Sequence, residues 1–316
     1  MIPLVTVIVP VYKTEEYLRA SLNSLLLQTL TDIQVVVVND CSPDNSKFII
    51  EEFVGKDERF EVVNHSINKG VGAARNSGLK KARGEYITFL DSDDSYPLDA
   101  LQRMYDAIRY SDADVVLGRM YEKGTGGKLT PVNYIENKIN EFLKLPYTNL
   151  REIPVVNFYC GSATNQMFKR NLFISNDVEF MEGVYHEDIP LTLETWFYAK
   201  KIIAINSIIL YRTIRQNENN LSATQTFNIK AFKDREEIIT YVHNFCLKYA
   251  RINNDLIFLT LEILQRINAT TEYMLLSVKE ENRNEIVKGW YPGYLKMYNF
   301  IINDIKTLNL ELEALA

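Results

Sequence analysis

Residues 4–40, which read LVTVIVPVYKTEEYLRASLNSLLLQTLTDIQVVVVND, decide the fold. A β-branched apolar run, Leu4–Pro10, comes first, and a second apolar run, Ile33–Val38, ends the stretch. Apolar runs of this length are typical of strands that are buried on both faces of a parallel sheet. The segment between them, from Thr14 to about Thr29, has helical character, with Thr14 as the expected N-cap. Together they predict a strand, a helix and a second strand parallel to the first.

The same alternation continues through residue 117. We expect further helices and strands in turn, with helices at 44–54, 72–82 and 98–110 and strands at 60–64, 85–90 and 113–117. This order predicts an α/β fold with an open, mostly parallel central sheet flanked by helices. Such sheets bind their ligands at the carboxyl ends of the strands.

The C-terminal part of the chain has a different pattern. From about residue 226 to the end, apolar residues recur at helical spacing, as in Phe245, Tyr249 and Ile252. This pattern predicts a region of three or four helices. We therefore divide the chain into an α/β domain, residues 1–222, and a helical C-terminal region, residues 223–316.

Composition and charge narrow the class of protein. The chain has 316 residues, 47% of them hydrophobic and 24% charged, as in ordinary soluble globular proteins. Its net charge of -6 argues against nucleic acid as the main partner, because phosphate backbones are bound by dense Lys and Arg surfaces. Cys41, Cys160 and Cys246 have no paired spacing, so we expect reduced, packed thiols. The absence of a signal-peptide pattern and of an apolar stretch long enough to span a bilayer predicts a cytoplasmic protein.

Polar and acidic residues follow three of the predicted strands. The first strand ends at residues 10–12, the second is followed by Asp40, and the fourth by Asp91-Ser92-Asp93-Asp94. Any one of these carboxylates could instead form a turn or a helix cap. The last cluster is harder to explain in that way, because two unit charges about 4 Å apart repel by about 4 kcal/mol at an effective dielectric constant of about 20. A divalent cation, Mg²⁺ or Mn²⁺, bound together with the phosphates of a ligand would neutralise it.

A glycine-rich segment, residues 68–78, opens the helix before this acidic cluster. Its glycines allow close approach of a ligand, and Lys69 or Arg75 could pair with phosphate. The pattern Gly70-x-Gly72, followed by Asp91, imitates a dinucleotide-binding fingerprint. That fingerprint belongs to the first strand–helix turn, however, and Arg75 occupies the position of its third glycine, so we disfavour this interpretation.

Taken together, these motifs resemble the family 2 glycosyltransferases, which have the GT-A fold. The likeness covers roughly residues 3–120, and more weakly 185–222. It is carried by VIVPVY at 7–12, NDCSPDNS at 39–46 and FLDSDD at 89–94, the last being similar to the family's DxD motif.

The resemblance implies a role for each matching residue. The residues it assigns to the nucleotide-sugar pocket are Pro10, Val11, Tyr12, Glu15, Asp40, Asn68, Arg75, Asp91, Ser92 and Arg212. Among them, Asp40 would accept a hydrogen bond from the base N–H, which suits uracil, and Arg212 would close over the diphosphate. Asp93 would bind the metal ion, Mn²⁺ or Mg²⁺. Asn39 and Cys41 stand where the family often has Asp and Gly, but neither change alters Asp40.

The segment Tyr185-His186-Glu187-Asp188 resembles the family's ED motif. Asp188 would then be the general base that takes the proton of the attacking hydroxyl, and Glu187 would contact the acceptor or orient the site. A single in-line displacement would invert the anomeric centre. On the residues alone, the two acids are better explained as favourable first-turn residues of a helix; the upstream motifs reverse that preference.

The resemblance therefore implies an inverting, metal-assisted glycosyltransferase. It would transfer sugar from a nucleotide-diphosphate donor, a UDP-sugar, to a saccharide, lipid-linked or protein-linked glycan acceptor in surface polysaccharide, wall polymer or glycan synthesis. One alternative is a sugar nucleotidyltransferase, which needs a Gly-rich basic loop where residues 11–14 read VYKT. The other is a non-catalytic nucleotide-sugar-binding assembly protein. The C-terminal helices leave self-association and peripheral contact with the inner face of the cell membrane open.

Overall fold

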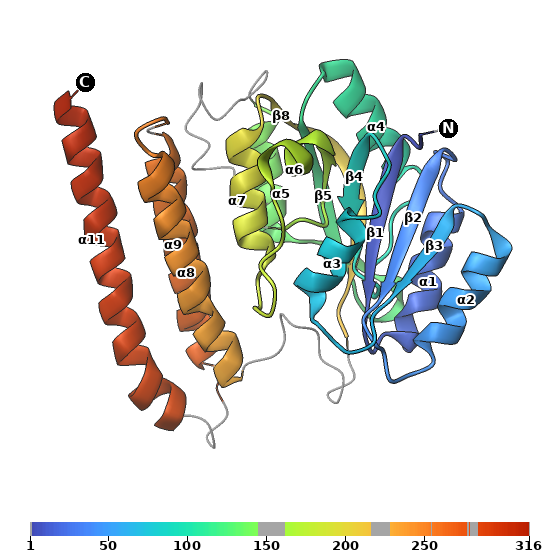
Figure 1. Ribbon diagram of the computed structural model, residues 1–316, viewed down its shortest axis with the longest axis horizontal. Helices are drawn as coiled ribbons and strands as arrows, with labels where there is room; N and C mark the ends of the chain where they lie inside the picture. The colour runs from blue at the N-terminus through green and yellow to red at the C-terminus, as the bar shows by residue number, and fades with distance from the viewer. Residues whose placement is uncertain are drawn as a thin grey trace.

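The computed structural model describes residues 2–144, 162–215, 228–253, 255–276, 278 and 284–315. Its centre is an eight-stranded sheet in the order β3-β2-β1-β4-β7-β5-β6, with β8 paired to β5 (Figure 1). The strands are β1 (Val5–Val11), β2 (Ile33–Asn39), β3 (Phe60–Asn64), β4 (Tyr86–Phe89), β5 (Val115–Lys123), β6 (Leu129–Pro131), β7 (Gln166–Lys169) and β8 (Ile202–Thr213). Strands β1 to β4 pair in parallel, as do β5 and β8, whereas β7 is antiparallel to both of its neighbours. The predicted mostly parallel α/β sheet is confirmed.

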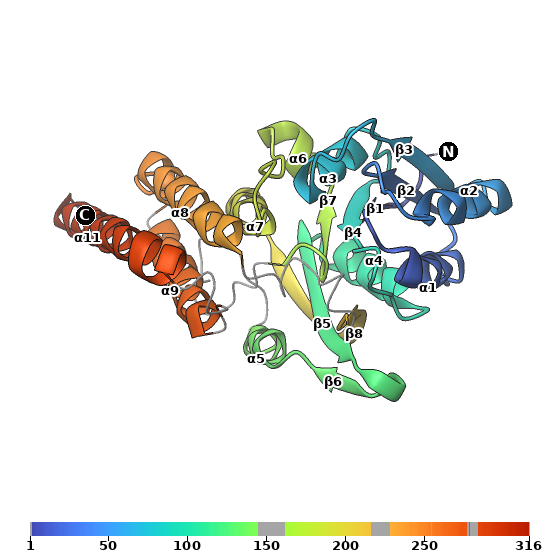
Figure 2. The same ribbon diagram turned by 90° about the horizontal axis from the view of Figure 1, so that it is seen from below.

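Burial on both faces explains the parallel centre of the sheet. Every residue of β1 and β2 is buried. Helices α1 (Glu15–Leu26) and α4 (Ala100–Ser111) lie on one side of the sheet, and α3 (Val71–Leu79) lies on the other (Figure 2). Helix α2 (Ser46–Lys56) packs against α1 and β3. Because β1 pairs in parallel with both β2 and β4, the carboxyl ends of these three strands open at one edge of the sheet.

The elements expected up to residue 117 are all present, but Thr14 does not cap α1 with its side chain. Its hydroxyl donates instead to Ser92 Oγ, 3.0 Å away. The backbone N–H of Glu15 is bound by the Asp44 carboxylate at 3.0 Å. A carboxylate from the next loop thus satisfies the helix start, which frees Thr14 to link the first strand to the acidic turn after β4.

The described residues between β5 and α7 (Asp188–Tyr198), 124–144 and 162–187, form only short elements. They contain a 3₁₀ turn, Thr125–Gly127, then α5 (Asn133–Phe142) and α6 (Asn171–Asn176) around the short strands β6 and β7. Before α7, Gly183 and His186 have positive φ angles of 77° and 66°.

The C-terminal region is helical, as predicted. It comprises α8 (Ile229–Tyr249), α9 (Asp255–Leu276), a π-helical segment, Asn284–Trp290, and α11 (Tyr291–Leu315), and it lies beyond α7 (Figure 1). The boundary expected at 222/223 falls outside the described residues. One cluster of buried apolar side chains runs from the sheet through α7 to α11, so the core is continuous.

Two features bear on the expectations from composition. Cys246 is buried, but Cys41 is exposed, which corrects the expectation of packed thiols; Cys160 lies outside the described residues. Across the described ranges, no helix combines the length and the apolar character needed to cross a bilayer.

Candidate functional site

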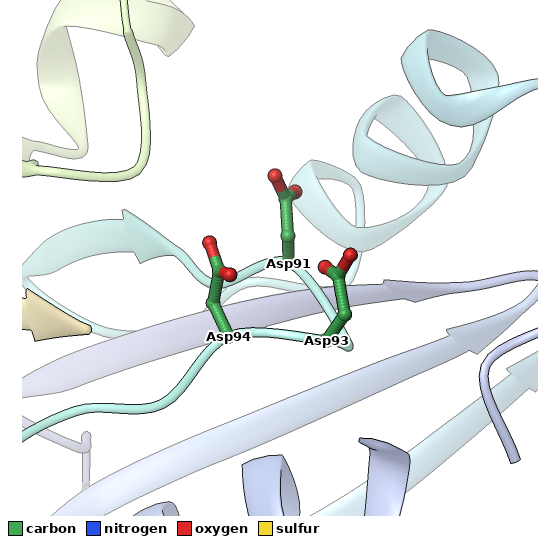
Figure 3. Close-up of side chains that lie close together, drawn as sticks. All are labelled: Asp91, Asp93 and Asp94. Atoms are coloured by element: carbon green, nitrogen blue, oxygen red, sulfur yellow. The ribbon is translucent and has the colours of Figure 1, made fainter. Parts of the chain in front are cut away.

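Three carboxylates converge in the turn that follows β4. Oxygens of Asp91, Asp93 and Asp94 all lie within 4.8 Å of one another (Figure 3). The turn is closed by a 2.9 Å hydrogen bond from the backbone N–H of Asp94 to the carbonyl of Asp91. The acidic turn, residues 91–94, therefore presents several carboxylate oxygens to one point at the edge of the sheet.

Each carboxylate of the acidic turn is held by a different part of the chain. Arg75 donates to Asp91 at 2.6 Å, and Arg215 donates to Asp93 at 2.7 Å. The backbone N–H of Thr213 donates to Asp94 at 2.8 Å. The end of β8 and the residues just after it thus support two of the three acids.

The acidic turn carries more negative charge than its protein partners neutralise. Burial raises the pKa of Asp93, although the charge of Arg215 opposes this. Burial, together with the charges of Asp93 and Asp91, raises the pKa of Asp94 well above its ordinary value. A hard divalent cation suits such an all-oxygen cluster, because it would offset this repulsion.

Arg75 joins the acidic turn to the segment that carries Glu187. Its guanidinium is buried, donates to Asp91 and forms a close ion pair with Glu187. It also lies over the Phe180 ring, 5.1 Å from the ring centroid. Burial alone would lower the pKa of Arg75, but its carboxylate neighbours raise it above the ordinary value. The residues expected to bind donor and acceptor are therefore linked through one side chain.

Glu187 and Asp188 are adjacent in sequence but differ in environment. Burial raises the pKa of Glu187, while its ion pair with Arg75 opposes the rise. Asp188, the first residue of α7, forms no ion pair with the described residues. Burial and the neighbouring charge of Glu187 raise its pKa to about 7. A carboxyl group with such a pKa can hold or release a proton near neutral pH.

Asp40 organises the loop that precedes α3. Its carboxylate lies 2.6 Å from His65 Nδ1 and accepts a hydrogen bond from the Asn68 amide at 2.9 Å. The backbone N–H groups of Lys69 and Gly70 each donate to it at 2.8 Å. Since both oxygens already have two partners, contact with a base N–H would require one of these bonds to open. Asp40 shapes this loop whether or not it also touches a nucleoside.

The residues predicted at the end of β1 differ in accessibility. Pro10 and Val11 are buried, whereas Tyr12 is 40% exposed. The Glu15 carboxylate accepts a hydrogen bond from the backbone N–H of Asn45 at 2.7 Å. Ser92 is buried against Thr14. Tyr12 and Glu15 are therefore the members of this group that are exposed to a ligand, and the Glu15 carboxylate already has a backbone partner.

Two arginines near the end of β8 have different partners. Arg212, the one predicted for the site, pairs with Glu122 of β5 at 2.7 Å. Arg215, which sequence reasoning missed, pairs with Asp93 instead. Nothing in the spacing of the two arginines distinguishes them. His65 was also missed, although its position directly after β3 is a place where ligand-facing residues gather.

A cavity of about 490 Å³ lies apart from this cluster, between the start of α4 and strands β5 and β8. Its lining includes Arg103 and Arg119, which are paired with Asp99 and Glu136. Because both cations are already neutralised, the cavity offers no surplus positive charge to a diphosphate. We therefore do not assign the donor to it.

Comparisons with known proteins are consistent with this arrangement of motifs. The model of the family described as glycosyl transferase family 2 matches residues 6–175. The uncharacterized glycosyltransferase EpsJ of Bacillus subtilis is 31% identical over 225 residues, which is 70% of this chain and 64% of EpsJ. The poly(ribitol-phosphate) beta-glucosyltransferase of Bacillus spizizenii is 29% identical over 251 residues, 78% of this chain and 38% of that protein. The chain thus spans less than two thirds of the length of both relatives.

Among solved structures, residues 1–349 of S. aureus TarS in complex with UDP-GlcNAc are similar to this chain. The two are 26% identical, with a TM-score of 0.70, and the match covers 90% of this chain and 79% of the TarS chain. The likeness extends past the sheet, since it covers more of the chain than the α/β domain alone.

Proposed function

The chain belongs to glycosyl transferase family 2, and from this premise we propose an inverting transfer of sugar from a UDP-sugar to a hydroxyl of a polysaccharide or wall-polymer acceptor. The observation that carries the proposal is the link made by Arg75 between Asp91 and Glu187. Through this link, the carboxylate cluster that suits a cation and a diphosphate lies next to the segment that carries Asp188, the carboxyl group that suits a general base.

The donor and acceptor classes rest on relatives. The neighbour TarS was solved with UDP-GlcNAc, which supports a UDP-sugar donor here. The name of the poly(ribitol-phosphate) glucosyltransferase supports a wall polymer as one acceptor class. Within the pocket, we assign the nucleoside to Tyr12, Asp40 and Asn68, with Arg75 and Arg212 nearer the diphosphate. A cytoplasmic location, or contact with the inner face of the membrane, stays a prediction.

The chemistry of the chain's own residues follows from their charges. Asp188 takes the proton of the acceptor hydroxyl while the oxygen of that hydroxyl forms a bond to the anomeric carbon. On the opposite face of the anomeric carbon, the bond to the diphosphate oxygen breaks. Glu187, fixed by Arg75, orients the acceptor side. Asp91, Asp93 and Asp94 would hold Mg²⁺ or Mn²⁺, which supplies stabilisation of negative charge on the leaving diphosphate. Arg215 adds positive charge beside Asp93.

The test is donor turnover by the purified chain with a panel of UDP- and dTDP-sugars, with and without Mn²⁺. We expect metal-dependent release of nucleoside diphosphate that Asp93→Asn and Asp188→Asn each reduce by about 100-fold or more. Asp112→Asn, which alters an exposed carboxylate, is the matched control. Transfer at a near wild-type rate by Asp93→Asn would disprove the metal role. If calorimetry detects no binding of UDP in the presence of Mn²⁺, the result would instead favour a non-catalytic protein.

A further inference from the structure

The loop immediately before Glu187 has a backbone conformation that needs external support. Gly183 and His186 both have positive φ, and for His186 this left-handed conformation is unfavourable by about 1 kcal/mol or more. The loop comprises residues 183–186 and leads directly into α7. Its conformation therefore decides where the side chains of Glu187 and Asp188 point.

Helix α8 supplies that support from the C-terminal region. The Asp234 carboxylate accepts a hydrogen bond from the backbone N–H of Tyr185 at 2.8 Å. The Lys230 ammonium donates to the carbonyl of Gly183 and to Asp234, at 2.5 Å in each case, and lies 5.3 Å from the centroid of the Tyr185 ring. Two backbone groups of the loop, the Gly183 carbonyl and the Tyr185 N–H, are thus bound by one ion pair.

The ion pair is itself fixed in place. Asp234 is buried, and its carboxylate is paired with the Lys230 ammonium. The start of α8 is capped by the Asn228 side chain, which accepts a hydrogen bond from the backbone N–H of Ala231 at 2.9 Å. Lys230 and Asp234 therefore lie in the first two turns of a helix whose start is fixed by its cap.

We propose that Asp234 and Lys230 are positioning residues for the transfer reaction, which hold the loop 183–186 so that Asp188 meets the acceptor hydroxyl. This inference rests on the proposed role of Asp188 as base. Among the described residues, the hydrogen bonds of the three carboxylates in the acidic turn go to Arg75, Thr213 and Arg215, and none goes to α8. Loss of the ion pair should accordingly disturb the base and leave donor binding intact. Displacement of a reacting group by about 1 Å can cost about 100-fold in rate.

The experiment compares Asp234→Ala, Asp234→Asn and Lys230→Met in the full chain. For Asp234→Ala and Lys230→Met we expect kcat to fall about 10- to 100-fold, with KM for the donor and the affinity for UDP changed less than about twofold. Asp234→Asn keeps an oxygen for the Tyr185 N–H and should recover much of the lost rate. Asp304→Ala is the matched control, because Asp304 contacts α8 at a different residue, His243, whose Nε2 lies 2.8 Å from the Asp304 carboxylate.

Three outcomes would overturn the proposal: kcat within about twofold of wild type in both Asp234→Ala and Lys230→Met, an equal fall in Asp304→Ala, or a parallel loss of UDP affinity. If Asp234→Ala does not fold, Lys230→Met decides the question, since the Lys230 side chain is 53% exposed. Asp188→Asn separates the two hypotheses. An active Asp188→Asn rejects the proposed base, whereas an inactive Asp188→Asn with active Asp234 and Lys230 variants rejects only the positioning role.

Discussion

At the scale of single residues, Arg75 is the side chain whose exact chemistry the site depends on. It is buried and contacts two carboxylates through two different guanidinium nitrogens, Nη2 to Asp91 and Nη1 to Glu187, a spacing that the single ammonium nitrogen of a lysine does not reproduce. Arg75→Lys should lower kcat about 100-fold or more and destabilise the fold by about 2–4 kcal/mol, because a buried carboxylate loses its partner. Urea unfolding and donor turnover would measure the two effects.

The matched control for this substitution is Arg83→Lys. Arg83 also pairs with a carboxylate, Glu61, but its side chain is 57% exposed. An exposed pair contributes about 0–1 kcal/mol, so little change is expected. Equal effects of the two substitutions would show that burial of Arg75 is not what makes it important.

The pH dependence of the rate follows from Asp188, whose pKa is raised to about 7. Below this pKa the carboxyl carries a proton and cannot accept one from the acceptor. With saturating Mn²⁺ and donor, kcat should therefore rise with pH up to about 7 and then level off, falling about tenfold per pH unit on the acid side. A profile that is flat between about pH 5 and 8 would contradict the assignment of Asp188 as base.

The sequence predicts the site residues that belong to short local motifs, such as Asp91 to Asp94 and Glu187–Asp188. It does not predict the partners that depend on how distant segments align. Arg215 reaches Asp93 because β8 pairs with β5 in one particular register, whereas Arg212 lies beside Glu122 in that same register. His65 binds Asp40 across two adjacent strand ends, a contact that one histidine in a sequence cannot reveal.

At the scale of elements, α3 is placed by a glycine at its start. A Cβ on Gly72 would lie 2.3 Å from the backbone carbonyl oxygen of Met181. Gly72→Ala should therefore push α3, which carries Arg75, away from the segment that leads to Glu187. We expect loss of stability by about 1–3 kcal/mol and a clear fall in kcat.

Gly55→Ala, at the end of α2, is the matched control because a Cβ there meets nothing within 4 Å. It should stabilise the protein by about 0.4–1 kcal/mol and leave kcat unchanged. Thermal unfolding and turnover of both variants test the idea. Wild-type stability and rate in Gly72→Ala would mean that the close contact with Met181 is not required.

The elements of the first 117 residues could be predicted because each has a strong period and clear boundaries. Strand β7 could not, since Gln166–Lys169 is only four residues long and is inserted antiparallel between β4 and β5. Its partner strands come from far earlier in the chain. The local sequence pattern does not predict such a pairing, because the pairing depends on the strands that surround β7 in the sheet.

At the scale of the whole molecule, the division at residue 222 describes chain order better than it describes packing. Phe197 of α7 packs edge to face against Phe245 of α8, with ring centroids 5.3 Å apart, and the hydroxyl of Tyr198 donates to that of Tyr249 at 3.1 Å. These contacts join the helix that begins with Asp188 to the C-terminal region. The α/β domain therefore shares its core with the helices that follow it.

A shared core predicts one cooperative unfolding transition for the full chain. Val242→Ala, which removes buried methyl groups of α8, should lower the stability of the whole by about 2 kcal/mol and move the single calorimetric peak. UDP bound with Mn²⁺ at the proposed site should stabilise the whole chain by about 2.7 kcal/mol at a ligand concentration 100-fold above Kd, and should therefore raise the temperature of the same peak. Two resolved peaks, one shifted only by Val242→Ala and the other only by UDP, would show that the helical region folds independently. In that case α8 could not hold the loop before Asp188 in the way its contacts indicate.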